Sequence, residues 1–254
     1  YDIDIVIEGD AINFCQKGEK AGYWSIKRIS EDFGTAKILL PNGLETDIAS
    51  TRTETYPRKG HLPVIEKIGC PLKEDILRRD FTVNALALSL NKADFGEVID
   101  YTTGLFDLEK KQLKILHDKS FIDDPSRIIR ALRFKHKLNF TTEPKTYSLM
   151  RDYLDDFNEN DIGYERIKQV LRLAFNLNSA ELFDEFTEEK ICKLLGNDLR
   201  LCSGKNIQAV IKTNFDKIDK NNIWLIYLSC LITSDYVEKL NLNSAEKEIL
   251  TALE

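Results

Sequence analysis

The sequence predicts an α+β fold, in which a small mixed or antiparallel sheet is followed by an entirely helical second part. The main observation is a change of hydrophobic period along the chain. Before about residue 115, apolar residues alternate in several segments, as in half-buried strands, and afterwards they recur with the spacing of amphipathic helices. No serine- or glycine-rich linker separates the two patterns, so we expect the two parts to pack directly.

Composition and charge restrict the class of protein. The chain has 254 residues, of which 43% are hydrophobic and 31% charged, and its formal net charge is −6. This length holds one large domain or two smaller ones. The negative charge argues against nonspecific coating of nucleic acid, but it allows a local basic site. No apolar run reaches the roughly 20 residues of a membrane helix. The chain begins at Tyr1 rather than at methionine, which indicates a fragment or a trimmed chain.

Five cysteines are scattered along the chain, and none of them belongs to a CxxC pair. Their odd number and irregular spacing indicate neither a disulfide framework nor a zinc site. We therefore expect free thiols in a reducing cytosol.

The first predicted strand carries two carboxylates on one side. Asp2 and Asp4 alternate with isoleucines between residues 1 and 7, so the aspartates share one face of the strand and the isoleucines the other. Two carboxylates on one face can converge on one or two divalent cations. The alternative is an exposed strand face that is acidic without a function.

Three more strands are expected at residues 25–29, 35–40 and 44–50, with a Pro-Asn-Gly turn before the last of them. Asp47 lies inside the last strand, where a carboxylate is disfavoured by propensity. A carboxylate from a neighbouring strand is what a two-metal site requires. An outward-facing aspartate remains the alternative at this position.

The next two segments are predicted as a loop and a helix. Within residues 52–70, two prolines and a glycine fall at positions 57–63 and predict a mobile loop. Residues 76–90 read ILRRDFTVNALALSL and place Asp80 and Asn84 four residues apart on one face. Together with the preceding Arg79, these side chains could hold a phosphate and a ribose hydroxyl. The alternative is a helix start that is capped by Asp80.

The segment FIDDPSRIIRALRF, residues 121–134, predicts a helix that begins at Asp124 and the proline after it. Arg127, Arg130 and Arg133 follow at spacings of three and share one side of that helix. Three arginines beside a positioned aspartate indicate a surface that holds anions and makes directed hydrogen bonds. The alternative is a capped helix with an ordinary basic face.

Four of these segments, in this order, resemble the class II tRNA nucleotidyltransferases, which are the CCA-adding enzymes, and their relatives the bacterial poly(A) polymerases. The matching segments are DIDIVIEGDA (2–11), DIASTRTETY (47–56), RRDFTVNALAL (78–88) and DDPSRIIRALRF (123–134). A fifth segment, IGYERI (162–167), is similar to a later ERI motif of the family. Asp123 stands where the family usually has Glu, and Gly163 replaces a common Ser. The family's glycine-rich segment before the carboxylate pair is absent because the chain starts at Tyr1.

The resemblance implies a fold, a domain organisation and a set of site residues. The expected fold is a polymerase-β-type nucleotidyltransferase head at residues 1–115, then a helical neck at 116–175 and an RNA-binding helical body at 176–254. The implied catalytic carboxylates are Asp2, Asp4 and Asp47, and the first two are expected to hold two Mg²⁺ ions. The implied nucleotide-binding residues are Arg79, Asp80, Asn84, Asp124, Arg127, Arg130 and Arg133, with the pair Asp124 and Arg127 reading the base.

The resemblance also implies an activity, which is template-independent addition of CMP and AMP from CTP and ATP to the 3′ end of tRNA in the cytoplasm. One Asp–Arg pair can serve both nucleotides, because cytosine and adenine each offer an amino donor beside a ring acceptor, whereas uracil and guanine offer the reverse. A CC-adding enzyme, an A-adding enzyme, a poly(A) polymerase and a noncatalytic RNA-binding module remain open, as does the oligomeric state.

Overall fold

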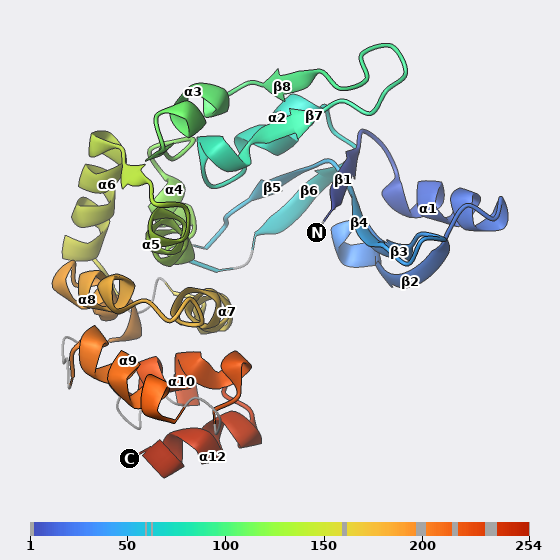
Figure 1. Cartoon of the computed structure of the whole chain (residues 1–254). Coiled ribbons are helices and arrows are strands. Elements are labelled where there is room, and N and C mark those ends of the chain that lie inside the picture. The colour runs from blue at the N-terminus through green and yellow to red at the C-terminus, as the bar shows by residue number, and fades with distance from the viewer. Residues whose placement is uncertain are drawn as a thin grey trace. The chain divides into compact units, whose positions relative to one another are not determined.

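The computed structural model describes residues 3–58, 60–61, 63–158, 162–196, 202–214, 218–231 and 238–253. The chain divides into two compact units. The first contains residues 1–57, 63–79 and 84–104, and the second contains residues 58–62, 80–83 and 105–254. Small sheets in the first unit and many helices in the second confirm the predicted α+β class (Figure 1). The boundaries of the head, neck and body remain predictions.

The first unit is built on a mixed four-stranded sheet. Its strand order is β1 (Asp4–Ile7), β4 (Glu45–Ser50), β3 (Thr35–Leu39) and β2 (Ser25–Ser30). β1 runs parallel to β4, and the other neighbours are antiparallel. A 3₁₀ turn (Glu31–Phe33) joins β2 to β3. The three strands expected at residues 25–50 are therefore confirmed.

Helix α1 (Ala11–Lys20) covers one face of this sheet (Figure 1). Its start is capped by Asp10, whose Oδ1 accepts a hydrogen bond of 2.9 Å from the Asn13 amide. Alternate strand residues bury against the helix because successive side chains point to opposite faces. The buried core contains Ala11, Cys15, Ala36, Ile38 and Ile48. The opposite face of the sheet carries the charged side chains.

The loop expected at residues 52–70 is wrong, because most of this segment is a hairpin. Strands β5 (Arg52–Thr55) and β6 (Val64–Ile68) pair antiparallel. The prolines and the glycine that indicated a loop fall between the two strands, whereas the flanking residues supply the ladder. Both strands belong to the first unit, and helix α2 (Leu72–Leu77) follows them.

The single helix expected over residues 76–90 is also wrong. Helix α2 ends at Leu77, a 3₁₀ turn spans Thr82–Asn84, and β7 (Leu86–Leu88) then pairs antiparallel with β8 (Val98–Asp100). Pairing with β8 has overridden the helix propensity of the Ala-Leu repeat, as tertiary context commonly does.

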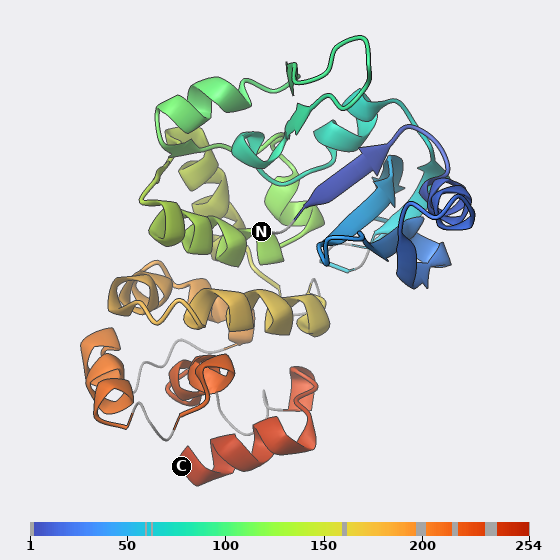
Figure 2. The same ribbon diagram turned by 45° about the vertical axis from the view of Figure 1, so that its right-hand side comes forward.

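Where the structure describes it, the second unit is helical apart from the short parallel pair β9 (Gln112–Leu113) and β10 (Thr141–Thr142). Figure 2 shows its later helices layered in succession toward the C-terminus. The α-helices are α3 (Gly104–Glu109), α4 (Ser120–Asp123), α5 (Ser126–Leu138), α6 (Pro144–Asp155), α7 (Tyr164–Phe175), α8 (Ala180–Glu188), α9 (Gly204–Thr213), α10 (Ile223–Ser229) and α12 (Ser244–Leu253). Shorter 3₁₀ helices span Ile191–Leu195 and Lys220–Asn222.

An aromatic cluster forms the centre of the second unit. Phe175 stacks on Tyr227 with ring centroids 5.6 Å apart, and Phe183 and Phe186 contact the same group of rings. Burial raises the pKa of Tyr227 to about 12. Its hydroxyl nevertheless keeps a hydrogen bond of 2.9 Å to Asn178, so the buried polar atom is satisfied.

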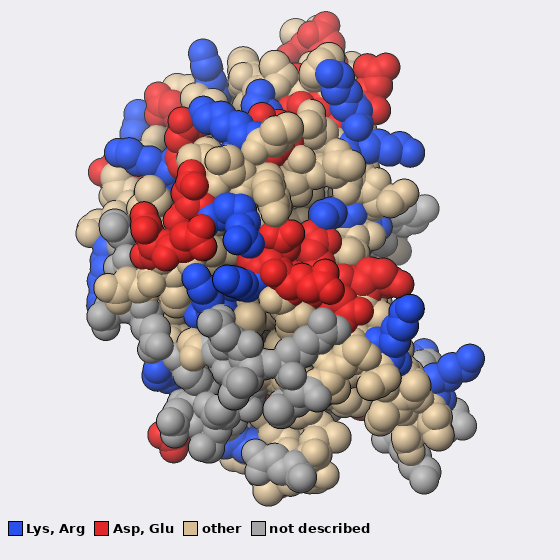
Figure 3. All heavy atoms as spheres, turned by 90° about the vertical axis from the view of Figure 1, so that its left-hand side faces the viewer, with Lys and Arg blue, Asp and Glu red and all other residues tan. Residues whose placement is uncertain are grey.

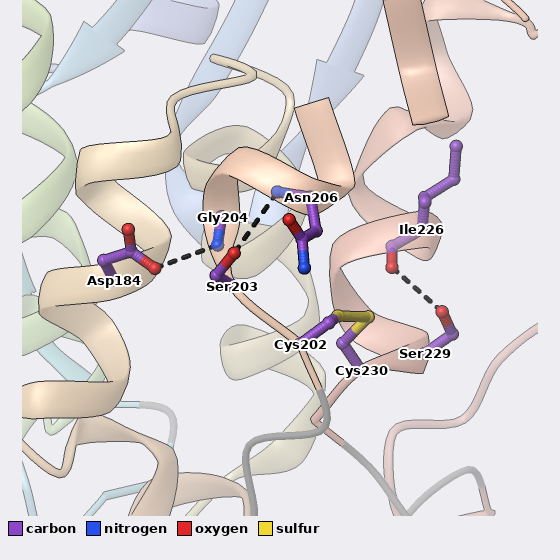
Figure 4. The surroundings of a disulfide bond; sticks show 8 residues. All are labelled: Asp184, Cys202, Ser203, Gly204, Asn206, Ile226, Ser229 and Cys230. Atoms are coloured by element: carbon purple, nitrogen blue, oxygen red, sulfur yellow. Dashed lines mark hydrogen bonds between the residues drawn. A yellow bond between two sulfur atoms is a disulfide. The ribbon is translucent and has the colours of Figure 1, made fainter. Parts of the chain in front are cut away.

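The expectation of five free thiols is wrong for two of the cysteines. Cys202, just before α9, and Cys230, just after α10, form a disulfide with Cα atoms 6.2 Å apart (Figure 4). The partners are separated by 28 residues, so no local motif indicated the pairing. The thiols of the other three cysteines, Cys15, Cys70 and Cys192, are buried and outside this disulfide.

The surface combines both signs of charge. On the face drawn in Figure 3, acidic side chains form a band beside separate groups of Lys and Arg. Ion pairs link several helices of the second unit, including Lys135 with Glu185 at 2.6 Å and Arg151 with Glu189 at 3.0 Å. Within the described residues, none of the helices has the length and apolar character needed to cross a membrane.

Candidate active site

Two of the expected catalytic carboxylates lie side by side on the charged face of the sheet. The parallel register pairs Asp4 on β1 with Asp47 on β4. Asp4 is exposed, and the side chain of Asp47 is 44% exposed. Asp2, the third expected carboxylate, lies outside the described residues. Among the residues that are described, no group of three or more His, Cys, Asp or Glu could hold a metal ion.

The two described carboxylates fit a hard divalent cation. Carboxylate oxygens are the ligands that Mg²⁺ prefers, and it commonly binds through only one or two of them. Asp47 already accepts a hydrogen bond of 2.7 Å from Nζ of Lys37 on β3. A cation bound at Asp47 would therefore compete with this ammonium for the carboxylate.

Arg79 does not project freely from the end of α2. Its guanidinium donates to Oδ2 of Asp75 at 3.0 Å, while Arg78 donates to Oδ1 at 2.7 Å. Burial by itself would raise the pKa of Asp75, but the two arginines outweigh it and hold that pKa below its usual range. Nε of Arg79 is buried and has no hydrogen-bond partner among the described residues. Asp75 thus orients an arginine that still has a donor to offer.

Asp80 and Asn84 do not share one helical face, because helix α2 ends at Leu77 and a separate 3₁₀ turn begins at Thr82. Asn84 is half-buried at the end of the 3₁₀ turn, in the first unit. Asp80 is buried in the second unit, where its Oδ2 accepts from Nε of Arg130 at 2.7 Å and also from the terminal nitrogen of that arginine. Two segments that sequence alone assigned to nucleotide binding are therefore joined by this ion pair.

Asp124 lies between α4 and α5 rather than at the first residue of a single helix. Helix α5 begins at Ser126, and Pro125 occupies the position before it. The carboxylate of Asp124 still serves the helix start, because Oδ1 accepts from the Ser126 amide at 3.1 Å. The predicted helix start is therefore displaced by one residue, and Asp124 is not the N-cap, although its carboxylate contacts the first helical amide.

The pair expected to read the base is buried. Asp124 is 2% exposed and Arg127 is 4% exposed. Nε of Arg127 lies 3.8 Å from Oδ2 of Asp124, and its terminal nitrogen donates to the hydroxyl of Ser120 at 2.8 Å. The two side chains thus lie together at low exposure, where an unmatched polar partner is costly.

Arg130 and Arg133 share one aromatic neighbour on α5. Their guanidinium carbons lie 5.6 and 5.2 Å from the ring centre of Phe134. Burial and the neighbouring charge of Arg130 lower the pKa of Arg133. Nε of Arg133 is buried without a hydrogen-bond partner among the described residues. An anion placed here would satisfy that donor and separate two like charges.

Sequence reasoning missed Arg166, although it lies in the ERI segment. Its guanidinium approaches Oδ2 of Asp124 at 2.6 Å. It also missed Asp75, although carboxylates three and four residues before arginines on a helix are a recognisable pairing signal. Gly163 has a steric role, because an added Cβ would lie 2.8 Å from the carbonyl oxygen of Gly60. The same carbonyl accepts the Gly163 amide at 2.8 Å.

Aligned carboxylates on a sheet, followed along the chain by a buried Asp–Arg pair, are features of enzymes that transfer nucleotides. The fold is of the polymerase-β nucleotidyltransferase type. Residues 1–114 match the family model described as the Poly A polymerase head domain. The chain belongs to the class II tRNA nucleotidyltransferase family, which comprises the CCA-adding enzymes and their relatives.

Similar proteins carry three related names. An A-adding tRNA nucleotidyltransferase of Aquifex aeolicus is 44% identical over 245 residues, which cover 93% of this chain and 29% of the relative. A CCA-adding enzyme of Lactobacillus johnsonii is 28% identical over 240 residues, covering 91% of this chain and 55% of the relative. A CC-adding tRNA nucleotidyltransferase of Deinococcus radiodurans is 38% identical over 122 residues, covering 48% of this chain and 32% of the relative.

A solved structure also resembles the whole chain. A tRNA nucleotidyltransferase complexed with a primer tRNA and an incoming ATP analogue has a TM-score of 0.76 and 27% identity. The likeness covers 100% of this chain and 75% of that structure. By contrast, the chain spans only 19% to 34% of the length of its A-adding relatives.

Proposed function

We propose that the protein transfers a nucleotide from a nucleoside triphosphate to the 3′ end of a tRNA. The observation that carries this proposal is the register of Asp4 with Asp47 on the charged face of the sheet. Family membership supports it, since the relatives are named for this activity. A noncatalytic RNA-binding module would have no use for two adjacent exposed carboxylates.

Asp4 and Asp47, together with Asp2, are the residues we propose for binding two Mg²⁺ ions. When bound, such ions lower the pKa of the attacking RNA 3′-hydroxyl and neutralise charge on the departing pyrophosphate. The backbone hydrogen bonds of the parallel β1–β4 pair hold Asp4 and Asp47 at the same register position. Arg79 and Asn84 are the proposed contacts to the triphosphate and ribose.

Asp124 and Arg127 are the proposed readers of the incoming base. A carboxylate only accepts hydrogen bonds and a guanidinium only donates them. Adenine and cytosine present the complementary pattern of an amino donor beside a ring acceptor. Uracil or guanine would leave two buried groups unpaired, at a cost of about 1–3 kcal/mol for each group. Arg130 and Arg133 are proposed to hold the rest of the nucleotide, with Asp80 fixing the direction of Arg130.

The relatives are named for adding different nucleotides, so the nucleotide that this protein adds is a separate question. We propose AMP addition to a tRNA that already ends in CC as the leading candidate, because A-adding relatives are 40% to 44% identical. Addition of the whole CCA end, which the sequence resemblance implied, is the second candidate. It is supported by CCA-adding relatives whose similarity extends over 91% of this chain at 28% identity.

One experiment separates these candidates. The full-length protein is incubated with Mg²⁺ and with three tRNA substrates, which end before CCA, after the first C, or after CC. ATP and CTP are supplied singly and together. An A-adding enzyme extends only the CC-ended tRNA and only with ATP, whereas a CCA-adding enzyme extends all three. Long adenosine tails would identify a poly(A) polymerase, and the absence of any extension would refute nucleotide transfer.

Two further expectations accompany this proposal. The helical residues 176–254 are proposed to contact the acceptor arm of the tRNA. The cytoplasm is the proposed location, since tRNA maturation requires access to tRNA and nucleoside triphosphates. Protection of a tRNA acceptor arm from nuclease by the full-length protein, and its loss when these helices are deleted, would test the first expectation.

A further inference from the structure

A pocket of about 380 Å³ lies on the charged face of the first unit. Its lining includes three basic residues, Arg28, Lys37 and Arg52, and one acidic residue, Asp47. Its volume is at the lower end of the range for small-molecule sites. The pocket therefore adjoins one of the proposed metal-binding carboxylates while having a mainly cationic lining.

The pocket is aligned with the carboxylates by the register of the sheet. Asp4 pairs with Asp47, Asp47 pairs with Lys37, and Lys37 pairs with Arg28, so the four residues form one row across four strands. The row runs from two acidic residues to two basic ones. Neighbouring strands lie about 4.8 Å apart, so Arg28 is roughly 10 Å from the Asp47 strand.

A β-bulge brings Arg28 into this row. The β2–β3 register shifts between Ile26 and Arg28, so that Arg28 rather than Lys27 is the partner of Lys37. Bulges redirect a side chain at the edge of a functional site. Lys27 is exposed on the same strand but is not among the lining residues of the pocket. The backbone irregularity thus selects which basic side chain reaches the pocket.

The lining also provides an aromatic side chain and a hydroxyl group. Phe33 is 44% exposed, and the guanidinium carbon of Arg52 lies 5.6 Å from its ring centre. Arg52 also donates to Glu54 at 3.3 Å, which holds it beside the ring. Cations combined with an exposed aromatic ring are the means by which proteins hold single-stranded nucleic acid. Thr35 adds a hydroxyl to the same lining.

We propose that this pocket holds the 3′-terminal nucleotide of the RNA that is extended, with Arg28 and Lys37 on its phosphate and Phe33 against its base or sugar. The assignment rests on the proposed function. An RNA end is favoured over a nucleoside triphosphate because Arg79 and Asn84, on other elements, are already proposed for the triphosphate and ribose.

Lys37 connects the pocket to the carboxylates. Its ammonium donates to Asp47 at 2.7 Å and also lines the pocket. The phosphate of the terminal nucleotide would bind beside this ammonium. The 3′-hydroxyl of the same nucleotide could then face Asp47, one strand away from Lys37.

The test compares Arg28→Ala with Lys27→Ala in the full-length protein. Both changes remove one exposed positive charge from β2, but only the first removes a lining residue. Binding of a CC-ended tRNA without nucleotide is measured by fluorescence anisotropy over a range of salt concentrations. We expect Arg28→Ala to weaken binding at least tenfold and Lys27→Ala by less than twofold. Loss of one phosphate contact should also reduce the log–log salt slope by about 0.7.

Steady-state kinetics distinguishes the two possible sources of the phosphate. Arg28→Ala should raise KM for tRNA about tenfold and leave KM for ATP within twofold, and Arg28→Lys should recover most of the loss. A rise in KM for ATP alone would overturn the RNA assignment, as would identical behaviour of the Arg28 and Lys27 variants. Because RNA binding is measured without turnover, its selective loss would support the pocket even if no transfer activity were found. If the Arg28 and Lys27 variants both transferred nucleotides and bound RNA equally well, the pocket assignment would be refuted and the proposed function would stand.

Discussion

The guanidinium of Arg166 on α7 lies 2.6 Å from the carboxylate of Asp124, which precedes α5. Asp124 also accepts from the Ser126 amide, so its two oxygens have different protein partners. This arrangement fixes the plane of the carboxylate and thereby the direction of its remaining lone pairs. Arg166 therefore positions the proposed base-reading aspartate from a separate helix.

Replacing Arg166 with alanine is expected to reduce nucleotide selection. Without its partner, the buried carboxylate of Asp124 loses its fixed orientation and one of its hydrogen-bonding partners, at a cost of about 1–3 kcal/mol. We expect the ratio of kcat/KM for ATP to that for UTP to fall about tenfold or more. Arg172→Ala removes an exposed arginine from the same helix and serves as the control. Equal ratios in the two variants would contradict the positioning role.

Changing Asp124 to asparagine should alter selection in a different way. The amide presents a donor as well as an acceptor, so it can pair with the carbonyl edge of uracil or guanine. We expect incorporation of UMP or GMP to rise at least tenfold relative to AMP, while Mg²⁺ dependence stays unchanged. Arg127→Ala should relax selection as well. Primer extension with each nucleotide alone measures both effects, and unaltered preference in either variant would refute base reading by this pair.

Asp4→Ala is expected to abolish most of the transfer. Asp4 is exposed on β1, so the change should leave the fold intact while removing a proposed metal ligand. We expect kcat to fall by roughly 100-fold or more and the Mg²⁺ concentration for half-maximal rate to rise. Glu45→Ala removes an exposed carboxylate from the neighbouring strand β4 and is the control. An Asp4 variant with normal rate and normal metal dependence would exclude this site.

Asp75→Asn is expected to destabilise the protein in a pH-dependent manner. The pKa of Asp75 is lowered in the folded protein, because Arg78 and Arg79 outweigh the opposing effect of burial. Its contribution is therefore complete above the unfolded pKa of about 3.9 and is lost as pH falls through the lower folded value. The variant should lose about 2 kcal/mol of unfolding free energy at pH 7.

Urea denaturation at several pH values measures this difference. The wild type and Asp75→Asn should differ fully at pH 7 and pH 5 and should converge below about pH 4. Glu74→Gln changes the exposed neighbouring carboxylate and should have little effect. A difference that persisted unchanged in strong acid would show that the charge of Asp75 is not the source of the stabilisation.

Cys202→Ser should reveal the contribution of the disulfide. The bond closes a loop between residues 28 apart, for which the loss of chain entropy in the unfolded state corresponds to about 3.6 kcal/mol. We expect a lower Tm for the variant under oxidising conditions and equal Tm values for both proteins in excess dithiothreitol. A wild-type Tm that did not respond to the reductant would contradict a stabilising role.

The sequence predicts local features of the fold better than the pairing between segments. Strands at residues 25–50 follow from alternation, which depends only on neighbouring side chains. The β5–β6 hairpin was missed because Pro57, Gly60 and Pro63 dominate the segment, although they lie outside the two strands. In the same way, the Ala-Leu repeat at residues 86–88 is strand only because β8 pairs with it.

The candidate site shows the same division. The carboxylates on β1 and β4 could be proposed from sequence because Asp4 alternates with isoleucines and Asp47 stands in a strand, where its propensity is low. Their shared register depends on parallel pairing and was not predictable. The contact of Asp80 with Arg130 joins residues 50 apart, and that of Arg166 with Asp124 joins different helices. Such contacts depend on how the helices pack rather than on any local pattern.

The pairing of β1 with β4 also affects when the carboxylates can meet during folding. Strands β2, β3 and β4 are antiparallel neighbours joined by short turns. Strand β1 pairs only with β4, which is the last of these strands in the sequence. Non-local strand pairs generally form more slowly than local ones, because a longer loop must close first. Asp4 and Asp47 are therefore brought together late in sheet assembly. We therefore expect the proposed metal site to be completed only in the folded sheet and to be missing from a partly folded chain.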